Sequence, residues 1–143
     1  MDEMTEDAHE LIDAAGGTPP GSLRAALANA MVGLKKRYYG RGPEAAKAFI
    51  EDDYIFVVLE GGMTRNEETL LAAGKEDLVR QYRLTFQDVV GPTATGAVEE
   101  LTGRKVIGYH SQVVFDPFRA FEIFVLQPSG TLSGNGRSRP EDG

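Results

Sequence analysis

The chain has no cysteine among its 143 residues. Disulfides, thiolate metal sites and a cysteine nucleophile are therefore excluded. Histidine is also scarce, because only His9 and His110 occur. Metal sites built on histidine need ligands at paired spacings, and no such spacing is present. The sequence predicts no metal site and no bound cofactor.

Long hydrophobic runs are missing as well. No stretch approaches the roughly 20 apolar residues that a membrane-spanning helix requires. Met1 opens an acidic segment that lacks the apolar centre of a secretion signal. We therefore expect a cytoplasmic protein without direct membrane insertion, for which any membrane role would depend on another, membrane-spanning protein.

Lysine and arginine are absent from residues 1–21, which contain six acids and end in the Gly/Pro-rich stretch 16–21. Residues 129–143 are mostly glycine, serine and charged residues, and Leu132 is their one large apolar side chain. Neither composition offers enough apolar surface to offset the entropy of ordering. The sequence thus predicts a disordered acidic tail at 1–21, a single domain at 22–128 and a second disordered tail at 129–143.

The net charge of −7 belongs almost entirely to the first tail, which carries −6. Residues 22–128 hold 13 bases and 14 acids. A nearly neutral domain creates no field that attracts nucleic acid or anionic lipid. We expect no nucleic-acid partner.

Apolar residues at helical spacing predict three helices within 22–128. The first spans about 23–39, with Ser22 as N-cap and Gly40 at its end. The second is short and begins at a capping box formed by Thr64 and Glu67. The third follows a stripe that ends at Gly103 and should be kinked or broken at 91–92, where a glycine precedes a proline. Its predicted stripe consists of Leu78, Tyr82, Phe86 and Val89.

The remaining segments predict strands. Residues 54–59 are β-branched and aromatic, and residues 105–115 and 120–126 should form an antiparallel hairpin. The stretch before Ile50 reads as a helical turn followed by a further strand. The fold class is therefore α+β, with an antiparallel sheet of about four strands packed with helices. Because Gly-Arg recurs at 40–41 and 103–104 before each strand pair, an internal αββ duplication is one interpretation.

Both faces of these strands are apolar, whereas an antiparallel sheet with one wet face should alternate apolar and polar residues. In 54–59 the two alternating sets are Tyr54, Phe56, Val58 and Ile55, Val57, Leu59. The second face therefore needs cover, and a homodimer would supply it. Helices on both sides of a monomeric sheet are the alternative.

One short segment is a candidate ligand site, the run Gly40-Arg41-Gly42-Pro43. Glycines allow close approach of the backbone, and Pro43 suits the first turn of a following helix, whose N–H groups and Arg41 would hold an anion. The candidate ligand-binding residues are Tyr39, Gly40, Arg41, Gly42, Arg80, Arg83 and Arg104. A purely structural explanation is also open. The glycines and proline would end one helix and lead into a loop, and the arginines would lie on solvated helix faces. The bases at 35–37 would complement the dipole at the end of their helix.

The sequence contains no recognisable catalytic residues, so we expect a protein that is not an enzyme. His110 should project from its strand beside Gln112, away from an apolar set of Ile107, Tyr109, Val113 and Phe115, and a lone histidine does not establish a general base. The acid pairs at 52–53, 67–68 and 99–100 are expected to be solvated, because adjacent helical residues point in different directions.

Several motifs in order resemble the MpsC-like family over about residues 22–128. They are Tyr38–Pro43, Val58–Gly61, Thr69–Leu71, Leu78–Arg80 with Phe86–Gln87, Val98–Arg104 and Phe124–Leu126. The family carries the label "Na+-translocating membrane potential-generating system", and its long helix is usually unbroken where this chain has Gly91-Pro92-Thr93. The resemblance implies association with a membrane system and brings no catalytic residue.

Three functions follow as hypotheses, and the one that the residues favour least is an enzyme that uses Arg41, His110 and Tyr39. The first is a soluble accessory or regulatory protein that acts through protein–protein contacts, as a homodimer and with a membrane-transport partner. The alternative is a sensor of a small anionic ligand, a nucleotide or a carboxylate, bound at the Gly40–Pro43 segment.

Overall fold

The computed structural model describes residues 22–128, and the two predicted tails lie outside the described residues. The described chain forms three helices and four strands. Their order is α2 (Leu23–Tyr39), β1 (Ala45–Glu51), β2 (Tyr54–Glu60), α3 (Arg65–Ala72), α4 (Glu76–Thr102), β3 (Val106–Val114) and β4 (Arg119–Leu126). The predicted α+β class with a four-stranded sheet is confirmed.

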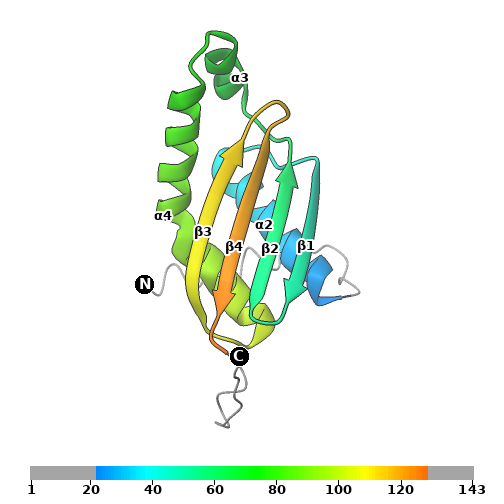
Figure 1. Ribbon diagram of the computed structural model, residues 1–143. Coiled ribbons are helices and arrows are strands. Elements are labelled where there is room, and N and C mark those ends of the chain that lie inside the picture. The colour runs from blue at the N-terminus through cyan, green and yellow to red at the C-terminus, as the bar shows by residue number, and fades with distance from the viewer. Residues whose placement is uncertain (1–21, 129–143) are drawn as a thin grey trace.

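The sheet is antiparallel throughout and has the strand order β1-β2-β4-β3 (Figure 1). Each hairpin occupies one half of the sheet, and the two hairpins meet through β2 and β4. An αββ unit repeated twice would produce this order, with α2 leading into the first hairpin and α4 into the second. The duplication itself stays a prediction.

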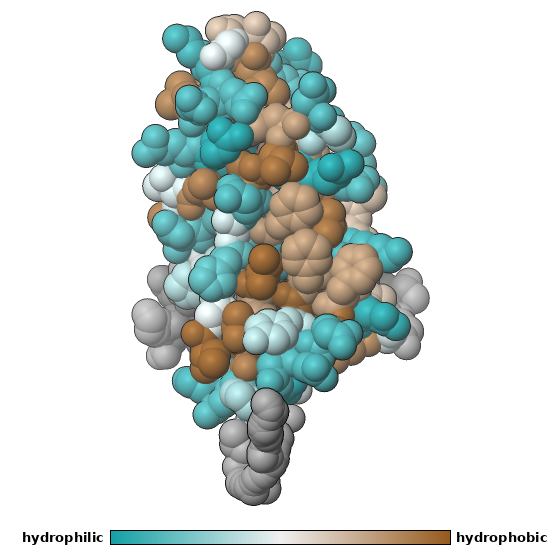
Figure 2. All heavy atoms as spheres, in the orientation of Figure 1, coloured by the Kyte–Doolittle hydropathy of each residue, from teal (hydrophilic) through white to brown (hydrophobic). Residues whose placement is uncertain are grey.

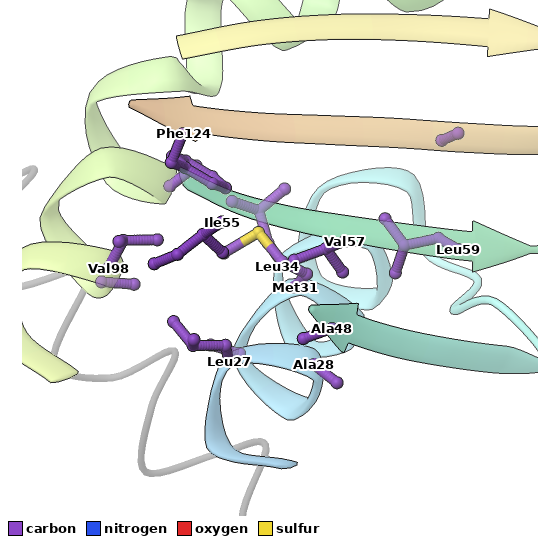
Figure 3. Close-up of a cluster of buried hydrophobic side chains, with 14 of the residues drawn as sticks. Leu27, Ala28, Met31, Leu34, Ala48, Ile55, Val57, Leu59, Val98 and Phe124 are labelled. Atoms are coloured by element: carbon purple, nitrogen blue, oxygen red, sulfur yellow. The ribbon is translucent and has the colours of Figure 1, made fainter. Parts of the chain in front are cut away.

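Helices α2 and α4 lie on the same face of the sheet, and the core forms between them and the inward side chains of β2 and β4 (Figure 1). Figure 3 shows Leu27, Met31 and Leu34 of α2 beneath Ile55 and Val57 of β2. These five side chains are essentially inaccessible to solvent. At about 1.5–3 kcal/mol for each large apolar side chain, their burial is a main source of the fold's stability.

The ends of α2 follow the sequence prediction. The Ser22 hydroxyl accepts a hydrogen bond from the Ala25 N–H at 3.1 Å, which satisfies one of the free donors of the first turn. Gly40 ends the helix with a φ of 80°, a left-handed conformation that glycine adopts without steric cost.

Helix α4 is not broken at Pro92, which corrects one of the two predicted outcomes. It continues as one helix of 27 residues with Pro92 inside it, and its axis changes direction partway along (Figure 1). Gly91 is buried against β3, where an added Cβ would lie 3.4 Å from the ring of Tyr109. The absent side chain therefore lets the helix approach the sheet closely at this point.

Three of the four residues in the apolar stripe predicted for α4 face solvent, and only Phe86 packs partly against the core, which is a second correction. Leu78, Tyr82 and Val89 are 54%, 50% and 63% exposed. The buried face begins one residue later in each turn and includes the polar residues Arg83 and Gln87. Sequence reasoning assigned the apolar side to the core because polar residues are rarely buried unless they are paired.

Two local predictions for the strands also need correction. Residues 45–51 form β1 from the start, so no helical turn follows Pro43. In β3, the pairing with β4 shifts between Val106 and Gly108, so Ile107 leaves the inward set and is 57% exposed. A single extra residue of this kind reverses the side-chain alternation locally.

The sheet face opposite α2 and α4, here called the outer face, is not covered by any element within residues 22–128 (Figure 1). Apolar side chains gather in its middle (Figure 2). The predicted apolar character of both faces is thus present in the structure, and the alternative of helices on both sides does not apply to the described chain. The large apolar residues that β1, β2 and β4 place on the outer face are Phe49, Tyr54, Phe56, Val58, Phe121, Ile123 and Val125.

Candidate functional site

The predicted segment Gly40–Pro43 packs against the connection between β2 and α3. An added Cβ on Gly62 would lie 3.0 Å from Pro43, so the two loops touch through their backbones. Arg41 Nη1 donates a hydrogen bond to the Met63 carbonyl at 2.8 Å. The same atom lies 3.8 Å from a carboxylate oxygen of Glu68 at the half-exposed surface.

Arg83 and Glu67 form a buried, bidentate ion pair beside this segment. Arg83 Nε donates to Glu67 Oε2 at 2.5 Å, and Arg83 Nη2 donates to Glu67 Oε1 at 2.6 Å. The guanidinium lies 3.8 Å from the ring centroid of Tyr39 and 4.8 Å from that of Phe118. Two parallel charge-assisted bonds between two aromatic rings hold α3, α4 and α2 together.

Glu67 is therefore not solvated, contrary to the sequence prediction. It is buried, and it also accepts the Thr64 N–H at 2.9 Å in the predicted capping box, which is confirmed. Burial by itself would raise the pKa of Glu67, but the hydrogen bonds from Arg83 and Thr64 outweigh it and hold that pKa below its ordinary value.

The lowered pKa of Glu67 predicts a loss of stability in acid. A carboxylate with a lower pKa in the folded state stabilises the fold above its unfolded-state pKa, and this contribution disappears as pH falls through the folded-state value. We expect the free energy of unfolding, measured by urea titration, to fall below about pH 4.5. Glu67→Gln should be less stable at neutral pH and show a flatter acid dependence; an unchanged slope would contradict this.

A second buried network joins α2, α4, β3 and β4. Lys35 Nζ donates to Gln87 Oε1 at 2.7 Å and to Glu122 Oε2 at 2.9 Å. Tyr109 donates its hydroxyl hydrogen to the other Glu122 oxygen, and Ser111 Oγ lies 3.2 Å from Glu122 Oε2. Lys35, Gln87 and Glu122 are almost inaccessible to solvent. The ion pair therefore fastens both helices to the sheet at its inner face.

The surroundings of this network change the proton affinities of its members. Burial lowers the pKa of Lys35, and attraction to Glu122 restores part of it. Burial raises the pKa of Tyr109, and the negative charge of Glu122 adds to this effect. Burial likewise raises the pKa of Tyr39, against the opposing influence of Arg83. Both tyrosines are thus held in their neutral form, and Tyr109 donates its hydrogen to Glu122.

Two buried polar atoms, one beside this network and one in it, have no hydrogen-bond partner within the described residues. They are the hydroxyl oxygen of Tyr39 and the amide nitrogen Nε2 of Gln87. Lys35 is close to both residues, because its Nζ bonds Gln87 Oε1 and lies 5.7 Å from the Tyr39 ring centroid.

The structure brings five of the seven predicted ligand residues together and places Arg80 and Arg104 elsewhere. Tyr39, Gly40, Arg41, Gly42 and Arg83 gather at the β2–α3 connection. Arg80 lies one turn earlier on α4, where Glu76 and Asp77 bind it at 3.1 and 3.2 Å. Its guanidinium is 5.2 Å from the Phe115 ring centroid.

Arg104 lies at the other end of the sheet. It binds Asp53 at 2.6 Å and the Gln127 carbonyl at 2.8 Å, beside the turn between β1 and β2. The length of β2, about 20 Å for its seven residues, separates it from Arg83 at Gly62. The four arginines therefore form no common cluster, and anion binding at Arg41 stays a prediction.

Sequence reasoning missed the residues of the second network and the burial of Glu67. Lys35 was interpreted as a base that complements the helix end, although it follows Leu27 and Met31 at intervals of four residues. Glu122 points to the same side of its strand as Ala120, Phe124 and Leu126, so its inward position was visible in the strand pattern. The available signal for a buried ion pair was that Lys35 and Glu122 carry opposite charges and each lies on an otherwise apolar face of its element.

His110 is exposed on the outer face, opposite Ile123 of β4, as its strand position predicted. Within residues 22–128 no group of three histidine or acidic side chains is arranged to hold a metal ion.

The fold and its buried ion pairs define a small α+β domain whose charged interior groups bind one another. A family model described as "Na+-translocating membrane potential-generating system (MpsC)" matches residues 20–128, and the chain belongs to this family. No curated protein and no solved structure matches the chain. None of the helices in residues 22–128 is both long and apolar enough to cross a membrane.

Proposed function

We propose that this protein is a soluble, cytoplasmic, non-enzymatic accessory or regulatory protein of a membrane-potential-generating system, and that it acts through protein–protein contacts. The observation that carries the proposal is the exposed apolar stripe of α4, formed by Leu78, Tyr82 and Val89. Each of these side chains is at least half exposed, on the helix that also supplies the buried pair partners Arg83 and Gln87.

The stripe has the spacing of a helix face that docks into an apolar groove. Leu78, Tyr82 and Val89 are four and seven residues apart, so they lie along one side of α4. Tyr82 stacks on Phe86 and contacts Tyr39 edge-on, which fixes this side of α4 next to the C-terminal end of α2. A rigid row of large apolar side chains on one helix is typical of protein contact surfaces.

The charged groups of the interior favour contact rather than chemistry as the role of the domain. Lys35 and Arg83 are each held by a buried carboxylate, at 2.9 and 2.5 Å. Groups paired in this way stabilise the arrangement of the helices and keep the α4 stripe in place. The family description supplies the membrane-potential system, and a membrane-spanning component of that system is the proposed partner.

The proposal predicts that α4 captures an integral membrane protein. The full-length tagged chain, incubated with detergent-solubilised native membranes, should recover a reproducible membrane-spanning partner identified by mass spectrometry. Leu78→Ser combined with Val89→Ser should reduce that recovery at least tenfold, because it removes two apolar contacts of the stripe.

Leu23→Ser is the matched control, since Leu23 is an exposed leucine at the start of α2, outside the stripe. It should leave recovery unchanged. Equal recovery by the wild type and the α4 variant would contradict the assignment of the stripe, and the absence of any reproducible membrane partner would contradict the proposed function.

A further inference from the structure

We propose that the outer face of the sheet binds a second copy of this chain, so that the protein is a face-to-face homodimer. This inference goes beyond the proposed function, because it concerns a different surface from the α4 stripe. The outer face lies on the opposite side of the sheet from α4 (Figure 1).

An aromatic row crosses the outer face. The ring centroids of Phe49 and Phe56 are 6.2 Å apart, and those of Phe56 and Phe121 are 5.7 Å apart with nearly parallel planes. The row thus spans β1, β2 and β4, on the face whose middle carries apolar side chains in Figure 2. Phe49 and the nearby Tyr54 are 43% and 55% exposed. A continuous apolar surface of this kind marks an interface in soluble proteins.

A hollow of about 340 Å³ adjoins this row on the same face, and Phe49 contributes to both. Its other outward-facing walls are Ala45 and Lys47 of β1 and Val58 and Glu60 of β2. In a two-fold dimer the same surface serves both partners, so each projection needs a matching recess on the same patch. The aromatic row beside the hollow meets this requirement. The side chains of Phe56 and Phe121 in one copy can enter the hollow of the other copy.

The size of the face is sufficient for a specific dimer. The strands contain seven to nine residues. At about 3.4 Å per residue and about 4.8 Å between strands, the flat area of the sheet is roughly 500 Å². The accessible area of projecting side chains exceeds the flat area, so two faces together bury more than about 1,000 Å², the level expected of a specific interface.

The charges on the outer face suit a second copy better than other occupants. Glu51 and Glu60 balance Lys47 and Arg119, and all four lie on the edge strand or at strand ends. A neutral face with an apolar centre creates no repulsion between two copies. It also lacks the excess of bases that an anionic membrane surface or a nucleic acid would need.

The chain's own terminal segments match this face poorly. Residues 129–143 contain one large apolar side chain, Leu132. Residues 1–21 carry six acids and no lysine or arginine, and the outer face offers them no surplus of positive charge. A second copy brings an apolar area of equal size, which neither segment can do.

Sedimentation equilibrium of the full chain tests the dimer. Wild type should sediment at micromolar concentration with twice the chain mass of 15.5 kDa, and Phe121→Glu should sediment as a monomer. Val89→Glu is the matched control, because it places the same charge on an exposed apolar residue of α4 and should leave the dimer intact. A monomeric wild type, or a dimer that survives Phe121→Glu and is lost in Val89→Glu, would overturn the proposal.

Cysteine cross-linking decides the case if Phe121→Glu fails to fold. The chain has no cysteine, so Val58→Cys introduces a single thiol near the centre of the face. Mild oxidation should yield a disulfide-linked dimer from Val58→Cys and none from Val89→Cys. The reverse pattern, or a monomer whose outer face is protected from hydrogen exchange by residues 1–21, would refute the dimer. Because membrane-partner capture is read separately with the α4 variant, failure here and failure of the proposed function are distinguishable.

Discussion

Replacing Glu122 by leucine is expected to lower the free energy of unfolding by about 3–5 kcal/mol, because removal of one partner from a buried ion pair leaves the other charge uncompensated. Lys35 would keep only its bond to Gln87 Oε1, and Tyr109 would lose its acceptor. A domain of this size has about 5–15 kcal/mol of stability in total, so the variant should be close to unfolding. Urea titration at neutral pH measures the loss.

The double variant Lys35→Met with Glu122→Leu separates charge burial from packing. Removing both charges takes away the cost of desolvation together with the attraction, so we expect the double variant to recover at least about 2 kcal/mol over Glu122→Leu. It should remain below wild type, since Gln87 and Tyr109 still lack partners. Strictly additive losses from the two single changes would show that the pair is not coupled.

Arg83→Met is the second change with a large expected effect, again about 3–5 kcal/mol of destabilisation. It removes both bonds to Glu67 and leaves that carboxylate buried with only Thr64 as a partner. The contact of the guanidinium with Tyr39 is lost as well. Thermal or urea unfolding followed by circular dichroism would measure the change.

Arg80→Met provides the control on the same helix. Arg80 pairs with Glu76 and Asp77 at the surface, where ion pairs contribute about 0–1 kcal/mol. We therefore expect a loss of less than about 1 kcal/mol from this variant. Similar losses from Arg80→Met and Arg83→Met would contradict the special role given to the Arg83–Glu67 pair.

Local signals in the sequence located the secondary structure well. The capping pattern of Thr64 and Glu67, the serine before α2 and the glycines after α2 and α4 each act within one helical turn. The Asp52-Asp53 turn and the final hairpin were also predictable, because turn chemistry is local. Predictions failed at the helical turn expected after Pro43 and at Ile107, whose orientation depends on the register between β3 and β4.

The interior ion pairs were beyond local reasoning. Lys35 and Glu122 are 87 residues apart, and Glu67 and Arg83 are 16 apart on different helices. A charged residue considered without its partner is predicted to be solvated, because burying a charge is costly unless an opposite charge lies within bonding distance. Because Arg83 is buried with its partner, the buried face of α4 lies one residue further along the chain than the predicted one. Leu78, Tyr82 and Val89 are therefore exposed.

The sequence by itself determined the α+β class, the apolar character of both strand faces and the membership of a family, because these depend on composition, periodicity and motif order along the chain. Only the tertiary structure decided which polar residues enter the core, which side of α4 faces outward and which face of the sheet the helices leave open. The physical reason is that these outcomes depend on contacts between segments far apart in the chain. The free energy of such a contact depends on both partners and cannot be read from either segment alone.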